Sequence, residues 1–244
     1  MTTRICVLGL PRSGSHYVVE LLCRSFQNQK VTLTDLKEPF TIEDPVTIEL
    51  VDSLLHVEYK SGVKQGDNQF ETVDLLVNNR IDVINNSNSN QDIILRLFPM
   101  RYLDPYINDI INCLKKNNFK FVVLERQQIE QQILSCGRAV TTQQWFGKSD
   151  RTIVEFTEQS FDAMTWLYNR IKKFPSIIDA LGIEFSTIKY ETCIVDIERH
   201  FNMPVVNEVS IEKQSIDNPY DLISNGNQVR VFMKNLLGVN FDLC

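Results

Sequence analysis

Four consecutive polar residues, Arg12, Ser13, Gly14 and Ser15, stand between an apolar segment and the start of a helical pattern. A loop that opens a helix directs several unpaired backbone N–H groups, and the positive end of the helix dipole, toward one point. Gly14 allows the backbone to approach a ligand closely, the two serines supply hydroxyl donors, and Arg12 adds a permanent planar cation. This combination predicts a binding site for an anion such as phosphate.

The elements that position this loop are a strand before it and a helix after it. An apolar, β-branched run of strand length occupies residues 4–10 and ends at Pro11, and apolar residues return at helical spacing in 18–22. A Walker loop requires Gly-x-x-x-x-Gly-Lys followed by Ser or Thr, whereas Gly9–Ser15 reads GLPRSGS and lacks that lysine. The alternative to an anion site is a capped first helix with an exposed arginine and no ligand.

The string PRSGS after a first strand resembles the 5′-phosphosulfate loop of sulfotransferases, whose donor is 3′-phosphoadenosine 5′-phosphosulfate (PAPS). The resemblance implies that Arg12 holds the 5′-phosphate and the bridging oxygen, and that the hydroxyl of Ser15 assists. The residues that it assigns to donor binding in this loop are Pro11, Arg12, Ser13, Gly14, Ser15 and His16.

A second stretch, residues 119–145, reads as a buried strand, a polar corner and a helix. It resembles the sulfotransferase element that binds the 3′-phosphate of PAPS, which implies that Arg126 and Ser135 bind this phosphate and that Arg138 contributes. Soluble bacterial sulfotransferases of the trehalose type share a run matched here by Gln132, Ser135, Arg138, Ala139 and Trp145. This chain has two glutamines where those enzymes carry an Asp after the Arg.

A general base is expected at Glu38. The segment 31–36 reads as a second strand, and ligands bind at the carboxyl ends of strands in open parallel sheets. Partial desolvation beside Pro39 and Phe40 would raise the pKa of Glu38 toward a useful value. The trehalose-type enzymes carry their proposed base near this place, and the alternative is a solvated loop glutamate.

Two further comparisons with the family concern the strand 92–98 and the late part of the chain. The cytosolic sulfotransferases of animals have a catalytic His after a comparable strand, and this sequence has none there. Either Glu38 or another group is therefore the base. Family members also have a late basic loop that closes over the 3′-phosphate, and Lys213 is the matching residue here.

Composition limits the classes of partner. The chain has 25 Lys and Arg against 31 Asp and Glu, a formal net charge of −6, which disfavours nucleic acid and acidic membranes as partners. The six cysteines show no CxxC spacing, so we expect reduced thiols and no structural metal. No apolar run is long enough for a signal peptide or a membrane span, so a cytoplasmic location is expected.

We therefore expect one α/β domain over 1–244, with three layers, a mostly parallel central sheet and helices on both faces. The expected strands lie near residues 4–10, 31–36, 92–98, 119–124 and 185–189. Helices are expected at about 71–84, 102–116 and 151–175. Loop composition is seen around residues 61–69, inside a variable, acceptor-facing insertion at about 42–91.

The resemblance implies the P-loop-like sulfotransferase fold and transfer of a sulfuryl group from PAPS to a hydroxyl of a small-molecule, glycan or lipid acceptor. Adenosine 3′,5′-bisphosphate (PAP) would be the product, no metal would be required, and a homodimer is compatible with the family. Two alternatives stay open: a nucleotide-dependent kinase with a degenerate loop, and a non-catalytic nucleotide-binding module.

Overall fold

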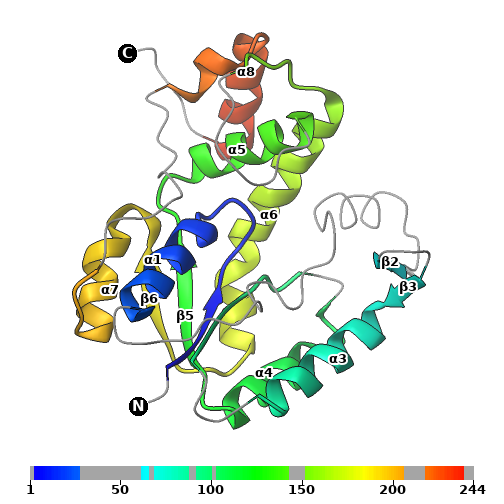
Figure 1. Ribbon diagram of the computed structural model, residues 1–244. Helices are drawn as coiled ribbons and strands as arrows, with labels where there is room; N and C mark the ends of the chain where they lie inside the picture. The colour runs from blue at the N-terminus through cyan, green and yellow to red at the C-terminus, as the bar shows by residue number, and fades with distance from the viewer. Residues whose placement is uncertain are drawn as a thin grey trace.

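The computed structural model of the protein describes residues 3–27, 62–65, 69–87, 92–100, 103–142, 152–205 and 218–238 (Figure 1). Within these residues, four strands form one sheet in the order β4-β1-β5-β6, and every pairing is parallel. The strands are β1 (Arg4–Leu8), β4 (Ile93–Leu97), β5 (Lys120–Glu125) and β6 (Phe185–Lys189). The fold is therefore α/β with a parallel sheet, as the sequence predicts.

Side chains of the central strands alternate between two helical layers, as the two-residue period of a strand requires. Cys6 and Leu8 face the first core. Ile5 and Val7 face the second core. Helices α3 (Val73–Asn85), α4 (Ile107–Lys116) and α6 (Glu158–Ala180) contribute to the first core, and α1 (Ser15–Gln27) and α7 (Cys193–Phe201) to the second. The sheet thus lies between two layers of helices (Figure 1).

A third apolar cluster is formed mainly by side chains of the helices that lie beyond the end of β5 (Figure 1). Helix α5 (Ile129–Thr142) packs there against the start of α6 and against α8 (Gly226–Leu237). A parallel bridge between Val154 and Ile223 joins the segments that precede α6 and α8. This cluster fixes α5, which carries several of the predicted site residues.

Some elements differ from the sequence-based expectation. Strands β2 (Gly62–Gln65) and β3 (Gln69–Thr72) pair antiparallel as a hairpin where loop composition was expected over 61–69, and β3 also takes the first two residues of the helix predicted at 71–84. Helix α4 begins at Ile107 and not near 102, because 103–106 form turns. The predicted strand 31–36 lies outside the described residues.

Helix α6 begins at Glu158 and not at 151, and it continues past Pro175 to Ala180. The late start follows from the cap, in which the Ser160 hydroxyl accepts a hydrogen bond from the Thr157 backbone N–H at 3.1 Å. An interior proline removes one backbone donor. The packing of Phe174 and Ile178 into the first core carries the helix beyond that residue.

Candidate anion-binding site

The loop between β1 and α1 has two residues in the left-handed backbone region. Arg12 has φ 63° and Gly14 has φ 88°. This conformation is unfavourable for an arginine and is natural for glycine. The loop therefore holds local strain at Arg12, and Ser15 follows it as the buried first residue of α1.

Tyr190 closes one side of the loop. A Cβ atom built on Gly14 would lie 2.1 Å from Cδ2 of Tyr190, so the aromatic ring occupies the space that any other side chain would need. Tyr190 follows β6 and also packs edge to face against Tyr17 of α1, with ring centroids 6.0 Å apart. Glycine at position 14 is thus required both by φ and by this close approach.

The side chain of Arg12 points to helix α5. Its Nε donates a hydrogen bond to Ser135 Oγ at 2.8 Å, across 123 positions of sequence. The buried amide of Gln132 on the same helix donates to the carbonyl of Pro11 at 2.9 Å. Burial lowers the pKa of Arg12, and the nearby positive charge of Arg126 lowers it too. The first turns of α5 therefore support the loop directly.

Arg126, which follows β5, completes the junction between the loop Pro11–Ser15 and helix α5. Its Nη1 donates to the carbonyl of Arg12 at 2.9 Å and its Nη2 to Gln131 Oε1 at 3.2 Å. The guanidinium lies over the ring of Tyr190, 4.9 Å from the centroid. Burial lowers the pKa of Arg126, while Tyr190 and Glu191 oppose that shift. Two predicted site segments, Pro11–Ser15 and Arg126–Ser135, are thus in direct contact.

The two backbone amides that immediately precede α5 already have an anionic partner. The carboxylate of Glu191 accepts hydrogen bonds from the N–H groups of Gln127 at 3.0 Å and Gln128 at 2.9 Å. Burial opposes ionisation of Glu191, but these amides outweigh it and hold the pKa of the carboxyl group below its usual value. These two amides are therefore not available to a phosphate near this helix, whereas the side chains of Arg126 and Ser135 lie beside it.

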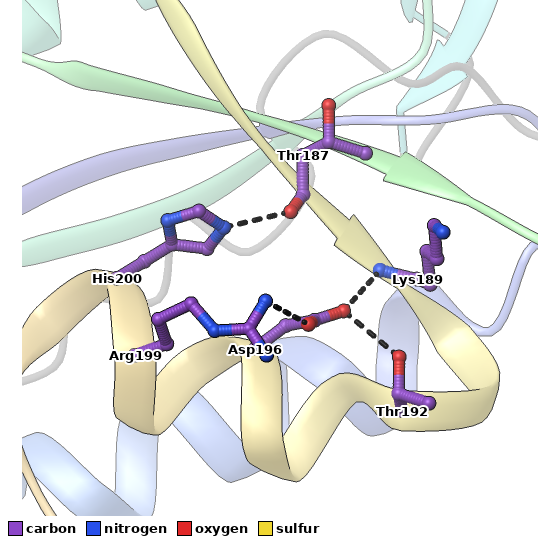
Figure 2. A network of polar contacts seen from close by, with 6 residues as sticks. All are labelled: Thr187, Lys189, Thr192, Asp196, Arg199 and His200. Carbon is purple, nitrogen blue, oxygen red and sulfur yellow. Dashed lines mark hydrogen bonds and ion pairs between the residues drawn. The ribbon is translucent and has the colours of Figure 1, made fainter.

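The turn that carries Tyr190 and Glu191 is held by the network in Figure 2. The Asp196 carboxylate accepts hydrogen bonds from the Lys189 backbone N–H at 3.0 Å and from Thr192 Oγ1 at 2.9 Å. Arg199 lies 3.5 Å from the same carboxylate. His200 Nε2 contacts the Thr187 carbonyl at 2.9 Å. These contacts fix the short 3-10 helix η2 (Tyr190–Thr192) between β6 and α7.

Ser13 is the best evidence that the loop accepts a polar ligand group. Its side chain is 2% exposed, and its Oγ has no hydrogen-bond partner among the residues that the structure describes. A buried hydroxyl without a partner is costly. A ligand oxygen could satisfy this hydroxyl, and the donor set of the junction, two guanidinium groups and serine hydroxyls, suits phosphate or sulfate.

The remaining predicted site residues have other contacts, directly follow the loop, or lie outside the described residues. Arg138 donates to the carbonyls of Leu222 at 3.3 Å and Thr152 at 2.7 Å, and so ties α5 to the segments before α8 and α6. His16 is half-buried in the first turn of α1. Glu38 and Lys213 lie outside the described residues.

Sequence reasoning gave no role in the site to Gln132, Tyr190 or Glu191. The available signal for the last two was their position, directly after the carboxyl end of a predicted parallel strand, where ligand sites gather. In the described part of the chain, no group of three His, Cys, Asp or Glu side chains could hold a metal ion. None of the helices described is long and apolar enough to cross a membrane.

Comparisons with known proteins give only low similarity. No family model and no curated protein matches the sequence. A solved chain from the PezAT chromosomal toxin-antitoxin system of Streptococcus pneumoniae is 12% identical, covering 98% of this chain and 89% of that one, with a TM-score of 0.35. Retinol dehydratase in a complex with retinol and PAP is 15% identical, covering 99% of this chain and 82% of that one, with a TM-score of 0.32. Similarity of this size identifies no family, so the function is inferred from the site.

Proposed function

We propose that this protein is a sulfotransferase that moves a sulfuryl group from PAPS to the hydroxyl of an acceptor. The observation that carries the proposal is the contact between the two segments that resemble the 5′- and 3′-phosphate elements of this family. Arg12 Nε lies 2.8 Å from Ser135 Oγ, and Arg126 Nη1 lies 2.9 Å from the Arg12 carbonyl. A ligand with two anionic ends suits such a site.

The charges of the site support an anionic ligand with more than one acidic group. Burial lowers the pKa of both Arg12 and Arg126, and Arg126 also acts on Arg12 as a like charge. Negative charge brought by a ligand would favour the protonated form of both guanidinium groups. The 5′-phosphosulfate and the 3′-phosphate of PAPS would supply that charge.

In this proposal the residues of the junction divide the work. PAPS, when bound, supplies the sulfuryl group and has PAP as its leaving group. Arg12 and the loop amides stabilise negative charge that grows on the leaving phosphate. Ser13 donates its hydroxyl hydrogen to the ligand, and Arg126 with Ser135 selects the donor by its 3′-phosphate.

The remaining assignments rest on the sequence. Glu38 is proposed to take the proton of the acceptor hydroxyl, and Lys213 to bind the 3′-phosphate. The acceptor is proposed to be a small molecule, glycan or lipid with a free hydroxyl. We also propose one domain over 1–244 and a cytoplasmic location, which agrees with the five free, buried cysteines among the described residues.

Replacement of Arg12 tests the proposal. Arg12→Ala removes the cation of the loop, so we expect PAP affinity and PAPS turnover to fall by about 100-fold or more. Arg24→Ala is the matched control, because Arg24 lies on α1 and forms an ion pair with Glu20 on its own helix at 2.8 Å. Calorimetry and a sulfuryl-transfer assay measure both quantities. Unaltered PAP binding in Arg12→Ala would refute the assigned role of the loop.

A further inference from the structure

We propose that Glu191 is a positioning residue for Arg126, and that it sets the affinity of the site for the second phosphate of its ligand. This inference rests on the proposed function, because only that function assigns a phosphate to Arg126. Glu191 is not proposed to touch the ligand. It acts through the chain segment on which Arg126 stands.

Glu191 contacts the backbone directly beside Arg126. The Glu191 carboxylate accepts hydrogen bonds from the N–H groups of Gln127 and Gln128, the two residues directly after Arg126, at 3.0 and 2.9 Å. Gln128 in turn provides the carbonyl that accepts from Gln132 N–H at 3.1 Å, in the first turn of α5. Both amides lie just before Ile129, the first residue of α5, so a carboxylate that binds them fixes the segment from which the helix begins.

The side chain of Arg126 is held by the same turn. Its guanidinium lies over the ring of Tyr190, the residue immediately before Glu191. The η2 turn thus holds Arg126 by two routes, with Tyr190 against the guanidinium and Glu191 on the backbone that follows. The Asp196 network keeps this turn in place between β6 and α7 (Figure 2).

The position of Arg126 determines how the second phosphate of the ligand is bound. Glu191 occupies the amides of Gln127 and Gln128, so the groups that the proposal gives to a phosphate at this end of α5 are the side chains of Arg126 and Ser135. A disordered segment before the helix would loosen Arg126 and weaken that phosphate most. The loop Pro11–Ser15 would still bind the first phosphate, because it is joined to β1 and α1 and Arg12 keeps its hydrogen bond with Ser135.

The experiment compares PAP with adenosine 5′-phosphate, which lacks the 3′-phosphate. In Glu191→Ala we expect PAP affinity to fall about five- to tenfold, as for the loss of a helix cap. Affinity for adenosine 5′-phosphate should fall less, because Arg126 acts on the loop indirectly, through the Arg12 carbonyl. Glu198→Ala is the control, because the Glu198 carboxylate also accepts from a backbone amide, that of Val205 at 3.4 Å, at the far end of α7. That variant should retain both affinities.

A double variant tests whether the effect passes through Arg126. Glu191→Ala added to Arg126→Ala should lower PAP affinity no further than Arg126→Ala alone. Additive losses would overturn the inference. If Glu191→Ala does not fold, Glu191→Gln serves, with an expected loss of about threefold for PAP and a smaller loss for adenosine 5′-phosphate, because a neutral acceptor binds amides less strongly than a carboxylate.

The outcomes separate the two claims. Wild-type protein that binds PAP no better than adenosine 5′-phosphate would refute the proposed function, and this inference with it. Wild-type protein that prefers PAP, together with a Glu191→Ala variant that keeps the full preference, would overturn the inference alone.

Discussion

At the scale of single residues, the site combines an arginine with a strained backbone and a glycine that has no room for a side chain. Arg12 and Gly14 both have positive φ, and Tyr190 fills the volume beside Gly14. Backbone strain of this kind persists only where the surroundings enforce it. Here Ser135 and Arg126 contact the side chain and the carbonyl of Arg12, so the strained residue is held from both ends.

Substitution of Gly14 should cost more than substitution of another glycine with positive φ. Gly182 also has positive φ, 54°, but a Cβ atom there would meet nothing within 4 Å. Gly182→Ala should therefore lower the free energy of unfolding by about 1–2 kcal/mol. Gly14→Ala adds the clash with Tyr190, which we expect to cost about 1–3 kcal/mol more. Urea unfolding of both variants measures the difference, and equal losses would contradict the close packing.

Ser13 should affect ligand binding and not stability. Its buried hydroxyl has no partner among the described residues, so Ser13→Ala should leave the free energy of unfolding unchanged or raise it by about 1 kcal/mol. PAP affinity should fall severalfold. Ser160 is the contrast, because its buried hydroxyl bonds the Thr157 amide and Thr141 Oγ1. Ser160→Ala should lower stability by about 1–2 kcal/mol. A comparable stability loss in Ser13→Ala would show that its hydroxyl is already satisfied.

At the scale of elements, the corner from β6 through η2 to α7 links the sheet to α5. Both carboxylates of this corner bind backbone amides: Glu191 those of Gln127 and Gln128, and Asp196 that of Lys189. For Asp196, as for Glu191, burial opposes ionisation, but hydrogen bonds with Lys189 and Thr192 outweigh it and lower the pKa. The corner should therefore be sensitive to acid.

The sign of the pH effect follows from the lowered pKa values of Glu191 and Asp196. Each group binds fewer protons in the folded state, so its stabilisation is complete above the ordinary carboxyl pKa of about 4 and is lost as the pH falls through the lowered value. Glu191→Gln and Asp196→Asn should each reduce the loss of unfolding free energy between pH 7 and about pH 3. Glu155→Gln, at an exposed position, serves as control. An unchanged slope in both corner variants would contradict the pKa directions.

Elements with a strong apolar period could be predicted from the sequence, and elements defined by capping or short pairing could not. The buried runs of β1, β4 and β5 were clear, because each is apolar on both faces. The hairpin β2-β3 lies in polar, glycine-containing sequence, where no apolar period indicates pairing. Apolar residues before Glu158 extend the helical pattern of α6, although Val154 belongs to a bridge and Phe156 to the third cluster.

At the scale of the whole molecule, the order of strands brings distant segments together. β1 lies between β4 and β5, and β6 lies beyond β5. All four are parallel, so the residues that follow β1, β5 and β6 gather at one edge of the sheet. The sequence predicted the loop Pro11–Ser15 and the segment from Arg126 to Ser135 as separate parts of one site. The ring of Tyr190 against Gly14 and the carboxylate on the start of α5 depend on three-dimensional packing that local sequence patterns do not encode.

The most direct test of the central claim is calorimetric binding of PAP to the wild-type protein, beside 5′-ADP and ATP with and without magnesium. The junction of Arg12, Arg126 and Ser135 predicts tight binding of PAP that needs no metal and exceeds the affinity for the other two nucleotides. Preference for ATP with magnesium would assign the chain to a kinase-like function. Absence of binding by all three would contradict the anion site itself.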